Sequence, residues 1–133
     1  GELQTAIIIP KKAYEGYFGH YIKYAMRNAM DIATTGCSVN VKLSEDKKTI
    51  LDARIAYGVA GPVPMRAPSA EAKIRGKETG RAAVKEFTQA VLEDINPRDS
   101  WRAAKDFREH IATVLAERAL CESIRLAGGE VHE

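Results

Sequence analysis

The sequence has little cysteine, few aromatic residues and no long apolar run, and each scarcity excludes a class of protein. Its two cysteines, Cys37 and Cys121, stand alone, so neither a disulfide framework nor a cysteine-based zinc site is indicated. The longest apolar run, Ala6–Ile9, is far too short to span a bilayer. No signal-peptide pattern is present. These features predict a soluble protein of the reducing cytoplasm.

The charge distribution gives no sign of a nucleic-acid-binding protein. The formal net charge is +2, and no dense stripe of Lys and Arg interleaved with aromatics occurs. The chain has 133 residues, of which 45% are hydrophobic and 29% charged, as expected of one globular domain with a real core.

The first ten residues differ in character from the rest. Leu3–Ile9 is short and rich in β-branched residues, and Pro10 closes it, which predicts a strand. Because the chain starts with Gly1 directly in this run, we expect a piece of a longer polypeptide or a processed subunit. The turn-rich connector that follows carries Tyr14, Tyr17 and Phe18, which are expected to pack against a neighbouring domain or partner.

Three strands are expected next, over residues 20–26, 32–43 and 49–57. Val39, Val41 and Leu43 alternate with polar residues, as Leu51 and Ile55 do later, which is the period of a half-buried strand. The polar segment 44–48 has hairpin length, so the strands should pair antiparallel. Residues 58–68 hold several prolines and glycines and are predicted to be a loop.

Helices are expected in the second half. The first follows Ser69 as its N-cap and ends at Gly76; the others cover about residues 80–94 and 103–126, with apolar residues on one side of each. Their apolar sides would cover one sheet face. The fold class predicted is α+β, a three-stranded antiparallel sheet covered by C-terminal helices.

Polar side chains gather where the first strand ends. Lys23, Arg27, Asn28 and Asp31 fall within nine positions. The donors among them, Lys23, Arg27 and Asn28, suit an anionic or polar ligand, but a basic strand edge that discourages aggregation gives the same pattern. For Arg27 and Asn28, contact with a ligand and an Arg27–Asp31 pair that braces the turn are equally open.

Other groups with catalytic potential are weaker candidates. The three histidines are His20, His110 and His132, and none has the spacing of a metal site. Asp31 and Asp52 could act as general bases, although hydrogen-bonded carboxylates at strand ends are commoner. Cys37 or Cys121 would need a basic neighbour to act as a nucleophile. Arg54 and Arg66 are expected to brace loops or meet a partner.

Several segments, taken in order, resemble one known family. Lys23, Arg27 and Met30–Ala33 are followed by Asp52–Ala67, then Ala70–Gly76, and finally Phe107–Leu115 with Arg118–Leu120. This order is similar to the C-terminal domain of the FAD-binding subunit of molybdenum hydroxylases, the xanthine dehydrogenase and carbon monoxide dehydrogenase flavoprotein family. The resemblance covers the chain from Leu3 to about Ile124.

The resemblance implies where this chain would contact FAD. A lysine eight residues before the Asp-Ile-Ala match, here Lys23, contacts the flavin from this domain in such proteins. The terminal strand of the preceding FAD domain touches the flavin through its backbone and matches at Leu3–Gln4, where Gln4 replaces the usual leucine. Residues 1–10 would then end the missing upstream FAD domain, and 11–133 would form a single α+β C-terminal domain.

The resemblance also implies a function within a complex. This chain alone is not expected to be catalytic. It would cap the flavin and dock a molybdenum-cofactor subunit and an iron–sulfur subunit, while electrons pass from iron–sulfur clusters to FAD and on to an acceptor such as NAD. Molybdopterin and the clusters would lie only in those partners. The alternative is a ligand-free protein-interaction module of the same fold.

Overall fold

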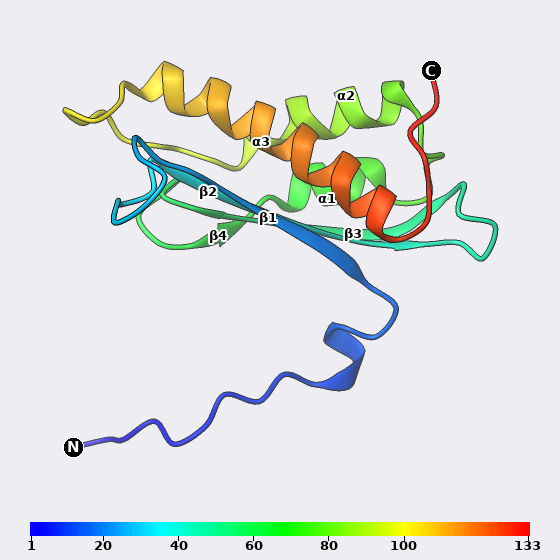
Figure 1. The fold of residues 1–133 in the computed structure, drawn as a ribbon, viewed down its shortest axis with the longest axis horizontal. Coiled ribbons are helices and arrows are strands. Elements are labelled where there is room, and N and C mark those ends of the chain that lie inside the picture. The colour runs from blue at the N-terminus through cyan, green and yellow to red at the C-terminus, as the bar shows by residue number, and fades with distance from the viewer.

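The computed structural model describes residues 1–133 and contains one antiparallel sheet whose strands follow chain order (Figure 1). The strands are β1 (Phe18–Tyr24), β2 (Thr35–Leu43), β3 (Ile50–Gly58) and β4 (Met65–Arg66). The predicted α+β class is therefore confirmed, with one strand more than expected. β4 lies inside the predicted loop 58–68, where Arg66 pairs with Ala56 and Met65 with Tyr57.

The register of β2 and β3 buries one side of each strand. Val39 pairs with Ile55 and Cys37 with Tyr57, and all four side chains are at most 1% exposed. The expected burial of Leu51 is wrong, since its side chain is 48% exposed. The register shifts between Lys42 and Leu43, and this bulge moves Leu51 to the other side of the strand.

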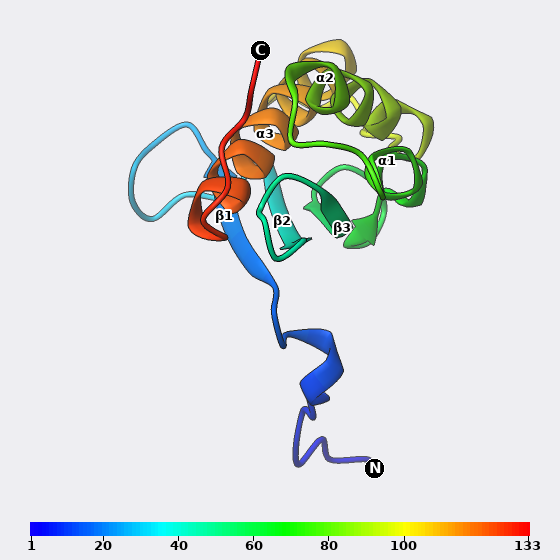
Figure 2. The ribbon, with the colours of Figure 1, turned by 90° about the vertical axis from the view of Figure 1, so that its right-hand side faces the viewer.

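Helices cover the buried face of the sheet (Figures 1 and 2). They are α1 (Pro68–Ile74), α2 (Arg81–Ala90) and α3 (Lys105–Leu126), with short 3-10 turns η1 (Lys11–Ala13) and η2 (Val91–Glu93). α3 packs on β1 and β2, α1 packs on β3, and α2 lies against α1 and α3. The apolar residues expected on the helix at 80–94, namely Ala83, Phe87, Ala90 and Val91, are all buried, with Val91 in η2.

The start of α1 corrects one sequence expectation. Ala67 is the N-cap, without a side-chain cap bond, and Pro68 occupies the first helical turn, where its missing amide hydrogen costs nothing. Ser69 is therefore not the cap: its amide and hydroxyl both donate to the carboxylate of Asp94, at 2.9 and 3.1 Å. Gly76 follows the helix at φ +79°, as expected of a terminating glycine.

Residues 1–10 contain no helix or strand and are exposed. Figure 1 shows this segment running away from the sheet and its helices. A strand over residues 3–9 needs a partner strand, so its pairing with an upstream domain stays a prediction. No helix in the structure combines the length and the apolar character needed to cross a membrane.

Candidate functional site

Lys23 lies near the C-terminal end of β1, on the sheet face opposite the helices. Its neighbours Ile22 and Tyr24 pack against the core, and strand alternation turns Lys23 and Tyr21 the other way. We call this side the open face; it includes Tyr21, Lys23, Ser38, Asn40 and Arg54. The Lys23 ammonium donates a hydrogen bond to the backbone carbonyl of Asp31 at 2.5 Å.

The segment between β1 and β2 is held by Asp31. Its carboxylate accepts hydrogen bonds from the amides of Arg27 and Ile32, both at 2.9 Å. Loss of water raises the pKa of Asp31, but these amide bonds outweigh that effect and the pKa is lowered overall. Arg27 also donates through its guanidinium to the carbonyl of Met30 at 2.8 Å. Asp31 is therefore an ionised brace and not a free general base.

Two glycines lie beside Lys23 in the sheet. Lys23 pairs with Gly36, and Gly36 pairs with Gly58, so the three residues form one row across the sheet. A Cβ at Gly36 would lie 2.8 Å from the hydroxyl of Tyr21, which shows that the Tyr21 ring lies over the β2 backbone. Tyr21 is 58% exposed. A cation and an exposed aromatic ring thus stand together here.

The structure does not bring Leu3 and Gln4 to Lys23. Both residues are exposed, and their segment joins β1 through the Phe18 end, whereas Lys23 lies near the other end of that strand. Figure 1 shows the N-terminal segment away from the body of the domain.

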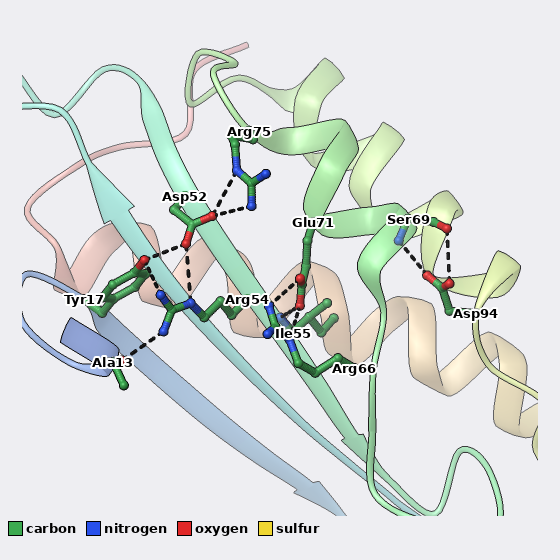
Figure 3. Close-up of polar contacts among 10 residues, drawn as sticks. All are labelled: Ala13, Tyr17, Asp52, Arg54, Ile55, Arg66, Ser69, Glu71, Arg75 and Asp94. Atoms are coloured by element: carbon green, nitrogen blue, oxygen red, sulfur yellow. Dashed lines mark hydrogen bonds and ion pairs between the residues drawn. The ribbon is translucent and has the colours of Figure 1, made fainter. Parts of the chain in front are cut away.

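Tyr17 ties the connector to the sheet (Figure 3). Its hydroxyl donates to Asp52 at 2.6 Å and accepts from the Arg54 guanidinium at 2.6 Å, and that guanidinium also lies 4.1 Å from the Tyr17 ring centre. Tyr17 thus has an internal role, whereas Tyr14 and Phe18 remain 57% and 46% exposed. Docking of a neighbour at these two aromatics stays a prediction.

Asp52 is enclosed by cations. Arg75 donates to its carboxylate at 2.8 and 3.1 Å, and the Arg54 Nε lies 3.4 Å away. Desolvation raises the pKa of Asp52, but Tyr17 and the arginines outweigh it and lower the pKa overall. Asp52 is therefore an ion-pair centre and not a poised base.

A second ion pair fixes β4 to α1. Arg66 donates two hydrogen bonds to Glu71, at 2.8 and 2.5 Å, and Glu71 also accepts from the amide of Ile55 at 3.1 Å. Figure 3 shows Glu71 between the helix and the sheet. Arg54 and Arg66 thus brace the fold, one of the two roles expected of them.

The cysteines are free and poorly suited to nucleophilic chemistry. Burial raises the pKa of Cys37 to about 12. Burial and then the charge of Glu117 raise the pKa of Cys121. A reactive thiol needs the opposite shift. No three His, Cys, Asp or Glu side chains come close enough together to hold a metal ion.

Sequence reasoning missed Arg108, which lies in a segment quoted only for its resemblance. Arg108 is 3% exposed and donates to the carbonyl of Thr34 and the hydroxyl of Ser100. It thereby joins the start of β2 to the segment before α3. The only sequence signal for a structural role of Arg108 was its position on the apolar side of a predicted helix, two residues after Asp106.

Comparison with known proteins assigns the family. Residues 20–123 match the family described as the CO dehydrogenase flavoprotein C-terminal domain. The chain is 35% identical over 130 residues to the xanthine dehydrogenase FAD-binding subunit of Escherichia coli O157:H7, covering 98% of this chain and 44% of that protein. It is 32% identical over 122 residues to the glyceraldehyde dehydrogenase medium chain of Sulfolobus acidocaldarius, covering 92% and 42%.

Solved structures agree with this match. A carbon monoxide dehydrogenase from Hydrogenophaga pseudoflava, lacking the Mo-pyranopterin moiety of its cofactor, superposes with a TM-score of 0.76 at 28% identity, covering 85% of this chain and 38% of that one. Quinoline 2-oxidoreductase from Pseudomonas putida 86 shares the fold, with a TM-score of 0.76 at 20% identity, covering 84% and 38%. The chain spans less than half the length of these relatives. It belongs to the CO dehydrogenase flavoprotein C-terminal domain family.

Proposed function

We propose that this chain is the C-terminal domain of the FAD-binding subunit of a xanthine dehydrogenase-like molybdenum hydroxylase. The observation that carries the proposal is the 35% identity to a xanthine dehydrogenase FAD-binding subunit along 98% of this chain. Lys23 keeps its residue type and its spacing of eight residues from Asp31. The domain would cap the flavin and dock partner subunits.

The residues around Lys23 fit contact with a flavin ring. Lys23 is exposed and positively charged, Tyr21 presents an exposed ring, and Gly58 adds no side chain to the same row. The backbone carbonyl of Asp31 accepts the hydrogen bond from the Lys23 ammonium. The side-chain carboxylate of Asp31 accepts hydrogen bonds from the amides of Arg27 and Ile32, which hold this residue in place. A positive charge held there favours negative charge on a bound aromatic ring.

When bound, FAD would accept electrons from iron–sulfur clusters and pass them to an acceptor such as NAD. Lys23 would orient the ring and raise its reduction potential by its charge. The backbone at Leu3–Gln4 would give a second contact, which the change to Gln4 leaves intact. The molybdenum-cofactor and iron–sulfur subunits would be the partners, and the complex would reside in the cytoplasm.

The test is the visible absorption spectrum of the full-length subunit, compared with its Lys23→Ala variant. We expect a yellow parent protein and a variant with weaker flavin retention or a lower reduction potential, with assembly intact. Lys48→Ala is the control, because Lys48 is exposed in the turn between β2 and β3, at the opposite end of the sheet.

The alternative is a protein-interaction module without ligand. It predicts a parent that stays colourless after reconstitution with FAD, and a Lys23→Ala variant that loses assembly with no flavin effect. A colourless parent would remove the flavoprotein assignment.

A further inference from the structure

A groove lies beyond β3, and of the residues in the contacts described above only Gly58 lines it. It has a volume of about 910 Å³ and lies between the loop Gly58–Pro64 and the segment Asn96–Asp99, with Lys105 beside them. The loop contributes the exposed apolar side chains of Val59 and Val63, which are 40% and 65% exposed. Because Gly58 shares a row with Lys23, the groove lies at the Lys23 end of the sheet.

Arg98 lines this groove. Arg102 and Arg108 belong to the adjoining structure, because Arg108 donates to Ser100 and Ala103, which flank Trp101 and Arg102. We call Arg98, Arg102 and Arg108 the arginine cluster. Burial and then the charges of Arg98 and Arg102 lower the pKa of Arg108, as expected of a buried cation with like charges near it. Arg108 donates only to neutral acceptors, namely the Thr34 and Ala103 carbonyls and the Ser100 hydroxyl.

No member of the arginine cluster forms an ion pair, unlike most arginines elsewhere in the domain. Arg54, Arg66, Arg75, Arg81 and Arg125 all meet a carboxylate within 4 Å. Like charges held together without an anion weaken the fold. The arginine cluster therefore costs stability and gains no ion pair within the chain. Such a cluster is expected where an anion from another molecule binds to it.

The carboxylates nearest in sequence are already engaged. Asp99 accepts a hydrogen bond from the amide of Lys105 at 2.7 Å, and Asp106 accepts one from the amide of Phe107 at 2.7 Å. Glu109 faces Lys105 at 3.7 Å. None of them neutralises Arg98 or Arg102.

Trp101 stands beside the cluster and is 86% exposed. The Arg102 guanidinium lies 4.2 Å from its ring centre, within the range of a cation–π contact. Trp and Arg are among the residues most enriched at the energetic centres of protein interfaces. An exposed tryptophan next to unpaired arginines therefore marks an interaction surface.

We propose that the groove, the arginine cluster and Trp101 dock an acidic segment of a partner subunit. Carboxylates of that segment would face Arg98 and Arg102, and an apolar side chain would lie against Val59 and Val63. Charge complementarity selects this occupant, because the cluster lacks any anion of its own. The proposal rests on the function proposed above in one respect: the partner is taken to be a subunit of the same complex.

The test measures binding of the full-length subunit to its purified partner subunits at low and high salt. We expect the double variant Arg98→Glu/Arg102→Glu to bind at least about tenfold more weakly than wild type. Wild-type affinity should fall with added salt, and the variant should lose that dependence. Arg118→Glu is the matched control, since Arg118 is exposed on α3 and also lacks an ion pair; its affinity should stay within about twofold of wild type.

Two further measurements separate lost docking from lost folding. The double variant replaces two charges that repel Arg108 with two that attract it, so its melting temperature should equal or exceed that of wild type. Trp101→Ala, which changes no charge, should also weaken binding. Wild-type affinity in both variants would overturn the proposal. The proposal would also fail if this surface only joined two copies of this chain. A colourless wild-type subunit would instead remove the flavoprotein assignment, so the two failures are distinguishable.

Discussion

At the scale of single residues, polar side chains join segments that are distant in sequence. Tyr17 and Asp52 fix the connector to β3, Glu71 joins α1 to β3 and β4, and Arg108 joins α3 to the start of β2. Sequence reasoning left Asp31 and Asp52 open as bases or as hydrogen-bonded groups. It could not decide, because their partners are backbone amides and arginines that only the folded chain brings near.

Glu71 gives the sharpest test of these joints. Glu71→Ala leaves the buried amide of Ile55 without its acceptor, so we expect a loss of about 2–3 kcal/mol of unfolding free energy. Glu71→Gln keeps an oxygen for that amide and should lose only about 1 kcal/mol. Urea denaturation of both variants makes the comparison. Equal stability of Glu71→Ala and wild type would contradict the joint.

Asp52 gives a test by pH. Its pKa is lowered in the folded state, so its stabilising contribution is present above the unfolded pKa of about 3.9 and is lost as the pH falls through the folded value. We expect Asp52→Asn to be less stable than wild type at pH 7, with the difference vanishing at strongly acidic pH. Denaturation midpoints at several pH values measure this. A difference that is constant with pH would argue against the ion pairs with Arg54 and Arg75.

At the scale of elements, alternation and glycine positions carried most of the prediction. Val39, Val41 and Ile55 point into the core as their spacing predicts. Leu51 does not, because a bulge changes the register of β2 and β3. No residue type in this segment predicts the bulge. β4 was not predicted, because a strand of two residues in a proline-rich loop is too short to show an alternating pattern. Ser69 suited an N-cap, but Asp94 from a distant segment binds it instead.

Gly76 allows a test of the α1 terminus. Its φ of +79° is unfavourable for a residue with a Cβ, so Gly76→Ala should cost about 1–2 kcal/mol. Gly58→Ala is the control, because Gly58 has no positive φ and no atom within 4 Å of an added Cβ. Thermal unfolding of both variants provides the comparison. A neutral Gly76→Ala would show that the turn after Ile74 tolerates another conformation.

At the scale of the whole molecule, the chain spans 44% of the FAD-binding subunit it resembles. Of the proposed flavin contacts, only Lys23 belongs to the folded body, since Leu3 and Gln4 lie in the exposed N-terminal segment. The flavin contacts were predicted from the resemblance to a known family. Composition and periodicity alone predicted only an α+β domain.

We therefore expect this 133-residue chain to release FAD where the full-length subunit retains it. Gel filtration after mixing with FAD, followed by absorption spectroscopy of the protein fraction, makes the comparison. Tight retention by the chain alone would show that the site is more complete than Lys23 implies.

The position of α3 has a consequence for synthesis of the protein. α3 is made after β1 and β2, yet it covers both strands. Until residues 105–126 leave the ribosome, the apolar side chains of those strands have no cover. The nascent domain therefore exposes the apolar side chains of these strands until α3 is made, the kind of surface that chaperones recognise.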